Sequence, residues 1–258
     1  LVSFPNGIHA VQAHFYLGQL YFREGQREKS IPHYKYVIGK SASEYLEQSL
    51  ARLSEVYLEN KNYSAAIPLL KRLETEASFA QNTIFAQSNL MKSYLEEGKY
   101  NEAVSYAEKV LANPDAETSA KNDAQVIIAR AAMRTGNEDR AKRAYAEVQK
   151  SASGELAAEA LYYDAYFKNK AGNFPASNDV VQRLARDYSG YKLYGAKGLV
   201  LMARNFYALG DAYQATYILE NVINNFSQFP EVVAEAKQEL ARIKAQEART
   251  NASVETNN

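Results

Sequence analysis

Gly98-Lys-Tyr-Asn-Glu-Ala103 places a small residue five positions after a glycine, and this pattern recurs along the chain. A variant of it, Lys61-Asn-Tyr-Ser-Ala-Ala66, has lysine at the first position. The other turns of this kind begin at Gly25, Gly136, Gly172 and Gly210. Successive turns lie 36 to 38 residues apart, and a fixed period of this size is typical of stacked repeat arrays.

Two stretches with helical spacing of apolar residues flank each turn. In the third unit they run over residues 83–97 and 100–112, and their intervals of three and four residues are the signature of amphipathic helices. Gly98 stands between them, where a helix C-terminus favours a residue that adopts positive φ. Pro114 then ends the second helix, because proline has no backbone N–H to donate. Each unit is therefore predicted to be a helix-turn-helix.

Small residues mark the predicted helix crossings. Gly18 lies seven residues before its turn, and Ala103 and Ala215 each lie five residues after theirs. Small side chains allow two packed helices to approach to about 8–10 Å. We therefore expect Ala103 and Ala215 to be buried between the two helices of their units.

The spacing of small, aromatic and glycine residues within a unit resembles that of the tetratricopeptide repeat. In the first unit, the small, aromatic, glycine, small and aromatic positions of that family correspond to Gly18, Tyr21, Gly25, Ser30 and Tyr34. The period departs from the family's 34 residues, and the chain contains no tryptophan, which that family often carries. The resemblance covers residues 9–249.

The resemblance implies an all-α protein, a right-handed α-solenoid of about six repeats followed by a C-terminal capping helix over 231–249. Residues 1–8 are interpreted as the end of a preceding repeat or a linker, and residues 250–258 as a disordered tail. The predicted repeats are 9–42, 43–80, 81–114, 115–151, 152–190 and 191–230. Together with the capping helix they form a single array over 9–249.

Slightly long repeats of this kind are similar to those of bacterial envelope lipoproteins and of the periplasmic partner of the Tol-Pal system. Residues 196–215 also resemble repeats in large cell-envelope proteins of Bacteroidetes-type bacteria. These likenesses favour a periplasmic or cell-envelope location over a cytoplasmic one.

Composition argues against several functions. Lys+Arg and Asp+Glu are both 30, and a neutral chain without a basic run lacks the charge that nucleic-acid binding requires. There are no cysteines, which excludes disulfides and thiolate chemistry. No apolar stretch reaches the roughly 20 residues needed to span a bilayer, so direct membrane insertion is not expected.

Motifs for catalysis or metal binding are missing. His9 and His14 are five residues apart, so they do not share a helical face as an i, i+4 metal pair does. No Gly-rich phosphate loop and no Gly-x-Ser-x-Gly turn is present. We predict no enzymatic activity, no catalytic residue, no metal and no cofactor.

The function that the repeat pattern favours is protein–protein interaction. Solenoids present extended concave surfaces for binding, and a partner protein or peptide segment is expected to lie in the concave groove. The alternative is a structural spacer or assembly subunit of a larger envelope protein or complex, with the groove occupied intramolecularly or by self-association. The oligomeric state is left open.

The resemblance also implies which positions line the groove. They are polar, charged or aromatic residues of the first helix of each repeat: Phe15, Gln19, Glu55, Phe85, Lys92, Arg130, Arg134, Tyr162, Tyr166, Lys197, Arg204 and Tyr207.

A row of basic residues among these positions has two interpretations. Arg130 and Arg134 are like charges at i, i+4, an arrangement that destabilises a helix unless something compensates. One compensation is a salt bridge to a neighbouring helix, with Glu159 or Asp123 as candidate partners.

The other interpretation is an acidic or carboxylate-bearing partner segment held between Lys92 and Arg204. Tyr162, Tyr166 and Tyr207 would then be its aromatic anchors, because tyrosine combines a large contact area with a polar tip.

Overall fold

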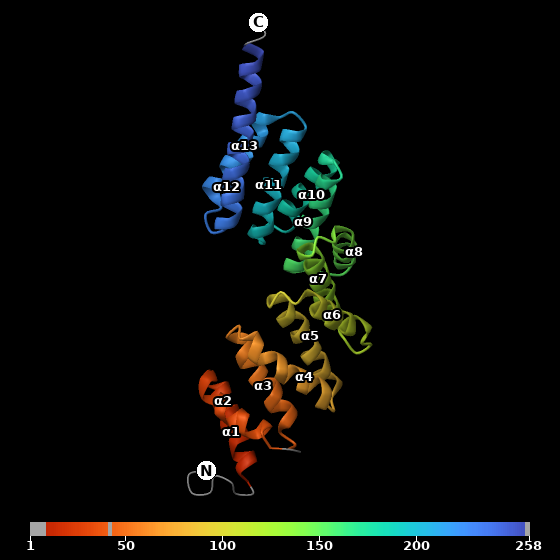
Figure 1. Ribbon diagram of the computed structural model, residues 1–258, viewed down its shortest axis with the longest axis vertical. Coiled ribbons are helices and arrows are strands. Elements are labelled where there is room, and N and C mark those ends of the chain that lie inside the picture. The colour runs from red at the N-terminus through yellow and green to blue at the C-terminus, as the bar shows by residue number, and fades with distance from the viewer. Residues whose placement is uncertain (1–8, 41–42, 256–258) are drawn as a thin grey trace. The chain divides into compact units, whose positions relative to one another are not determined.

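The computed structural model of the chain describes residues 9–40 and 43–255. Thirteen helices and no strand occur in this part of the chain, so the all-α prediction is confirmed. Residues 1–8, interpreted from sequence as the end of an earlier repeat or a linker, lie outside it. The helices are α1 (Ala10–Arg23), α2 (Arg27–Ile38), α3 (Leu46–Glu59), α4 (Tyr63–Glu76), α5 (Ala80–Glu96), α6 (Tyr100–Ala112), α7 (Thr118–Arg134), α8 (Glu138–Val148), α9 (Gly154–Lys170), α10 (Phe174–Asp187), α11 (Lys192–Ala208), α12 (Ala212–Asn225) and α13 (Pro230–Glu255) (Figure 1).

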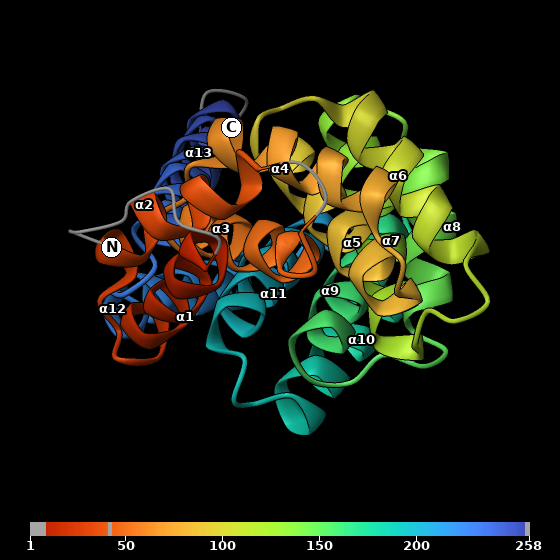
Figure 2. The same ribbon diagram turned by 90° about the horizontal axis from the view of Figure 1, so that it is seen from below.

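The chain divides into two compact units, with the boundary between Ala141 and Lys142 inside α8. Unit 1 contains α1 to α7, and unit 2 contains α9 to α13. In both units each helix packs on the next one along the chain, as the pairs α1–α2 and α9–α10 show (Figure 2). A single array over 9–249 stays a prediction from sequence.

Each hairpin turn has the geometry that its glycine predicts. Gly98 has φ +72°, its own N–H donates to the carbonyl of Leu95 at 3.0 Å, and the N–H of Lys99 donates to the carbonyl of Tyr94 at 2.8 Å. This pair of bonds is a Schellman motif, which satisfies carbonyls at the helix end. Lys61 adopts the same left-handed conformation at φ +54°, although it has a Cβ that disfavours it.

Polar residues directly after the turn start the second helix of several hairpins. The side chains of Asn62, Asn173 and Asp211 accept hydrogen bonds from backbone N–H groups three residues later. Such N-caps satisfy one of the unpaired donors of a helix start. A C-cap and an N-cap therefore follow each other within two residues, which keeps these hairpins tight.

The helix crossings are as close as the small residues predict. Ala103 and Ala215 are both fully buried, so that expectation is confirmed. At Gly18, an added Cβ would lie 2.8 Å from the ring of Tyr34, a distance at which one of the two must move. Glycine at this position therefore lets α1 and α2 approach each other.

The odd-numbered helices share one side of each unit. Besides their neighbours along the chain, α3 contacts α5 and α5 contacts α7 in unit 1, and α9 contacts α11 and α11 contacts α13 in unit 2. Within either unit, no two even-numbered helices are in comparable contact among the described residues. Each unit therefore has its odd helices on the inner side of its curvature.

The last helix differs from the sequence-based expectation. α13 runs from Pro230 to Glu255, through most of the segment predicted as a disordered tail over 250–258. Alanine, glutamate, lysine and arginine, all strong helix formers, dominate its second half, and neither glycine nor proline interrupts it. Residues 256–258 lie outside the described residues.

Candidate partner-binding face

Each unit has its own odd-helix face, formed by α3, α5 and α7 in unit 1 and by α9, α11 and α13 in unit 2. All but two of the predicted groove residues lie on these helices. The two others, Phe15 and Gln19, lie on α1, the first helix of unit 1. The surroundings of the twelve predicted groove residues differ. They distinguish side chains that are accessible to a partner from side chains that are buried in the fold.

Phe15 is a core residue. It is 5% exposed and its ring stacks on that of Tyr45 at a centroid distance of 4.4 Å. It packs in the same cluster as Phe22 and Tyr34. The repeat register cannot reveal this, because Tyr45 lies before α3 and covers Phe15 only in the folded chain. Phe15 is therefore corrected from a groove residue to a packing residue.

The next predicted residues of unit 1 are half-buried. Gln19 lies on α1, and Glu55 on α3 pairs with Arg52 at 2.7 Å on its own helix. Phe85 on α5 packs against the buried cluster that contains Leu50. These side chains keep only part of their surface for another molecule.

The predicted groove cations of unit 1 are Lys92, Arg130 and Arg134, and their surroundings differ. Lys92 on α5 pairs with Asp123 on α7, with 2.5 Å between Nζ and Oδ2. Lys92 is exposed and Asp123 is half-buried, so solvent still screens the pair and it contributes about 0–1 kcal/mol to stability. Arg130 is half-buried, and Arg134 is exposed at the last residue of α7, where a cation is favoured by the helix dipole.

Tyrosines gather on α9 in unit 2. The rings of Tyr162 and Tyr166 both meet the ring of Tyr163 edge-on, at centroid distances of 5.0 and 6.0 Å. Both side chains are half-buried and pack against the core around Leu161. Burial raises the pKa of Tyr162, so its hydroxyl stays protonated and able to donate.

A buried carboxylate lies on the same helix. Glu159 is 2% exposed, and its two oxygens accept hydrogen bonds from the hydroxyls of Tyr145 and Tyr194, each at 2.8 Å. A buried carboxylate is costly unless such donors satisfy it. Glu159 therefore joins the end of α8 to α11 across α9.

The two predicted groove cations of α11, Lys197 and Arg204, each have a neighbour within unit 2. The Nζ atom of Lys197 lies 5.8 Å from the ring centre of Tyr162 and 5.7 Å from that of Tyr194, within range of cation–π attraction. Arg204 pairs with Glu235 at 2.9 Å and with Glu239 at 3.6 Å, both on α13.

The electrostatics of Glu239 reflect these contacts. Glu239 is only 8% exposed, and burial by itself would raise the pKa of its carboxyl. Hydrogen bonds from Arg242 together with the charges of Arg204 and Arg242 outweigh burial and lower that pKa. The carboxylate is therefore ionised at neutral pH and holds α11 and α13 together.

Tyr207 is also held by α13. Its hydroxyl donates to Glu247 at 3.2 Å, and the guanidinium of Arg242 lies 5.1 Å from its ring centre. Sequence reasoning assigned α13 a capping role and missed these contacts. The signal was available, since Glu235, Glu239 and Arg242 are spaced at i, i+4 and i+7 and so share one helical face.

Known proteins support the fold that these contacts describe. Residues 123–153 match the family described as tetratricopeptide repeat. A crystallised tetratricopeptide repeat protein from Parabacteroides merdae is 15% identical with a TM-score of 0.52, over 90% of this chain and 86% of that one. The apo form of RapI is also 15% identical, with a TM-score of 0.64 over 94% of this chain and 99% of that one. The chain has the tetratricopeptide-repeat fold.

No curated protein matches this chain. Over residues 9–40 and 43–255, no group of three or more histidine or acidic side chains is placed to hold a metal ion. In the same part of the chain, no helix is both long enough and apolar enough to cross a membrane.

Proposed function

We propose that this chain is a non-enzymatic protein–protein interaction scaffold that binds a segment of another protein on the odd-helix face of unit 2. The tetratricopeptide-repeat fold supports the general function, because repeat arrays of this kind present extended concave binding surfaces. The observation that carries the proposal is the group of half-buried aromatic and cationic side chains on α9 and α11: Tyr162, Tyr166 and Lys197.

These three side chains suit a partner segment of defined chemistry. The two tyrosine rings are fixed by packing, so they provide contact area with little loss of conformational freedom. Lys197 adds a positive charge beside Tyr162, which favours a carboxylate on the partner. An acidic segment with an apolar or aromatic residue therefore fits this part of the face best.

The contacts of α13 limit which other residues take part. Arg204 already binds Glu235 and Glu239, so an acidic partner would have to displace a carboxylate of the same chain. Lys92 is likewise paired with Asp123. Tyr166 and Lys197 are accordingly better candidates than Arg204 or Lys92.

Capture of partners from host extract tests the proposal. We expect Tyr166→Ala combined with Lys197→Ala to lower the amount of specifically captured protein by about tenfold or more, since residues that anchor an interface dominate its affinity. The matched control is Tyr213→Ala combined with Arg183→Ala, which removes an exposed tyrosine of α12 and an exposed arginine of α10, both on even-numbered helices. Equal capture by both double variants at equal melting temperature contradicts the proposal.

A second candidate function is a structural spacer or assembly subunit. The pairing of α13 with Arg204 and Tyr207 favours it, because part of the face is already occupied intramolecularly. Light scattering on the purified chain separates the two. A stable oligomer that Tyr166→Ala dissociates supports assembly, whereas a monomer that captures partners supports the scaffold.

We also propose a location in the periplasm or cell envelope. Its support is the sequence likeness of the long repeats to envelope proteins. Fractionation of host cells with an antibody to the chain tests it, and recovery in the cytoplasmic fraction would overturn it.

A further inference from the structure

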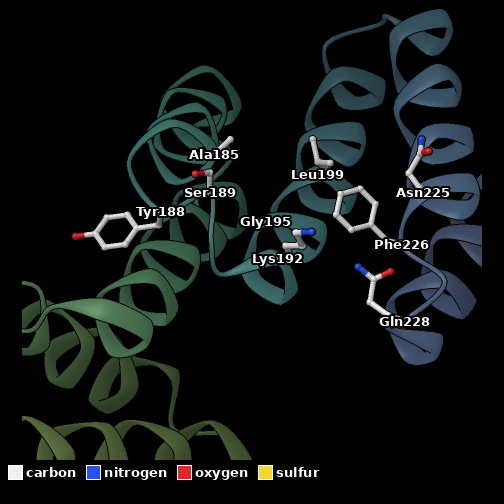
Figure 3. A pocket seen from close by; sticks show the side chains of 9 residues that line it. All are labelled: Ala185, Tyr188, Ser189, Lys192, Gly195, Leu199, Asn225, Phe226 and Gln228. Carbon is white, nitrogen blue, oxygen red and sulfur yellow. The ribbon is translucent and has the colours of Figure 1, made fainter.

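A cavity of about 330 Å³ opens at the loop end of unit 2. It lies between the end of α10, the start of α11 and the end of α12, and Figure 3 shows the side chains around it. Its lining residues are Ala185, Tyr188, Ser189, Lys192, Gly195, Leu199, Asn225, Phe226 and Gln228.

Gly195 forms an open part of this lining. An added Cβ at Gly195 would meet nothing within 4 Å, whereas at Gly198 on the same helix it would lie 3.1 Å from Val181. Close packing therefore explains Gly198 but not Gly195. Glycine inside a helix is less stable than alanine, so Gly195 lowers helix stability and keeps this space open.

The glycine is specific to the repeat that has this cavity. At the same repeat position, fifteen residues before the turn, the earlier units carry Ala10, Leu46, Thr83, Lys121 and Ala157. The open space beside α11 is therefore a feature of the sixth repeat and not of the repeat pattern.

The walls of the cavity are apolar and fixed. Leu199 and Phe226 are half-buried and pack against the core cluster of α11, α12 and α13, and both face the open space, while Tyr188 points away from it (Figure 3). The volume lies at the lower end of the range for small-molecule sites, about 300–1,000 Å³. It suits a body the size of one aromatic ring or a branched alkyl group.

A cation stands at the rim. Lys192 is exposed, and no carboxylate within the described part of the chain pairs with it. Among the other cations of unit 2, Lys168 pairs with Asp164, Arg186 with Asp187 and Arg204 with Glu235. An unpaired ammonium beside an apolar cavity attracts an anionic group on whatever fills that cavity.

We propose that this cavity binds a small carboxylic acid with an aromatic or branched aliphatic body. The body lies over Gly195 between Leu199 and Phe226, and the carboxylate faces the ammonium of Lys192. The site involves neither Tyr166 nor Lys197, so it does not depend on the function proposed for the odd-helix face.

Titration of the ¹⁵N-labelled chain with 3-phenylpropionate tests this site. We expect concentration-dependent shifts of the amide signals of Gly195 and its neighbours in the cavity. The uncharged 3-phenylpropionamide should bind several-fold more weakly, and added salt should weaken the acid but not the amide, because a solvent-exposed ion pair is screened.

Two substitutions test separately how much the apolar body and the carboxylate of the ligand contribute to its affinity. Gly195→Leu should fill the space and lower the affinity for both probes by about tenfold or more, since a blocked pocket loses its apolar contacts. Lys192→Met keeps the apolar stem, so it should lower the affinity for the acid to that for the amide. Gly190→Ala is the matched control, because Gly190 also has open space but does not line the cavity.

Folding of the variants is checked by thermal melting. Gly195→Leu should melt no lower than the parent, because leucine is the better helix former. If it melts lower, Gly195→Ala serves instead and should lower the affinity several-fold. The proposal is overturned if neither probe shifts the cavity signals, if acid and amide bind equally, or if filling the cavity leaves binding unchanged.

Discussion

At the scale of single residues, two positions each carry an unfavourable feature, a left-handed backbone at Lys61 and an unpaired buried hydroxyl at Tyr34. Lys61 has φ +54° at a position where the other repeats have glycine. Tyr34 is fully buried, and its hydroxyl has no hydrogen-bond partner in the structure. Each predicts a substitution that stabilises the protein.

Lys61→Gly should raise the free energy of unfolding by about 1 kcal/mol, because only residues with a Cβ are penalised in the left-handed region. Chemical denaturation monitored by circular dichroism measures the change. Lys61→Ala is the control and should bring no such gain, since alanine keeps the Cβ. A gain equal to that of glycine would show that the lysine charge, and not φ, is responsible.

Tyr34→Phe should also stabilise the protein, by about 1 kcal/mol, because it removes a buried donor that finds no partner. The opposite sign is expected for Tyr145→Phe, which takes away one of the two hydroxyls bound to Glu159 and should cost about 1–3 kcal/mol. Denaturation of both variants under one set of conditions makes the comparison. Loss of stability in Tyr34→Phe would mean that water or a side chain satisfies the hydroxyl in solution.

At the scale of helix pairs, the small residues at the crossings set how closely two helices pack. Ala103→Leu and Ala215→Leu should each cost about 1–3 kcal/mol, because extra methylenes cannot fit a crossing that is fully buried. Ala112→Leu, at an exposed position of α6, is the matched control and should change stability little. Parent-like melting of both crossing variants would show that the repeat register is misassigned.

The α1–α2 hairpin should lose stability in mild acid. His14 and His33 meet at 2.9 Å between their Nδ1 atoms. Burial lowers the pKa of both, and the charge of His33 lowers that of His14 further. A depressed histidine pKa means that the unfolded chain binds more protons, so stability is complete above the ordinary histidine value of about 6.5 and falls as pH drops below it.

Urea denaturation at pH 7.5 and pH 5.5, with a probe in the first hairpin, measures this effect. His33→Gln should reduce the difference between the two pH values, and the exposed His9→Gln should leave it unchanged. A pH dependence that persists in His33→Gln would assign it to other groups.

At the scale of the whole molecule, stability is expected to be local. Each helix contacts only near neighbours in sequence, so the free energy is roughly a sum of repeat and interface contributions. Removing residues 230–258 should expose the apolar surface against which Val232, Ala236 and Ile243 are buried and leave Arg204 without its carboxylates.

Hydrogen exchange on the truncated chain should show lost protection or aggregation in α11 and α12 while α1 to α5 stay protected. The uncut chain is the reference. Uniform, all-or-none loss of protection along the truncated chain contradicts the repeat-array description.

The fold class, the hairpin turns and the small residues at the crossings could all be predicted from the spacing of residue types. All three follow from spacing along one helix or turn, as with Gly98 and Ala103 five residues later. Such local patterns can be recognised without knowing which distant segments pack together. Which side chains are covered depends instead on packing between distant segments, and no local pattern predicts it. Phe15 is buried because Tyr45 stacks on it, and Arg204 is held because α13 lies beside α11. The cavity beside Gly195 likewise exists only where α10, α11 and α12 meet, because burial depends on contacts between segments that are far apart along the chain.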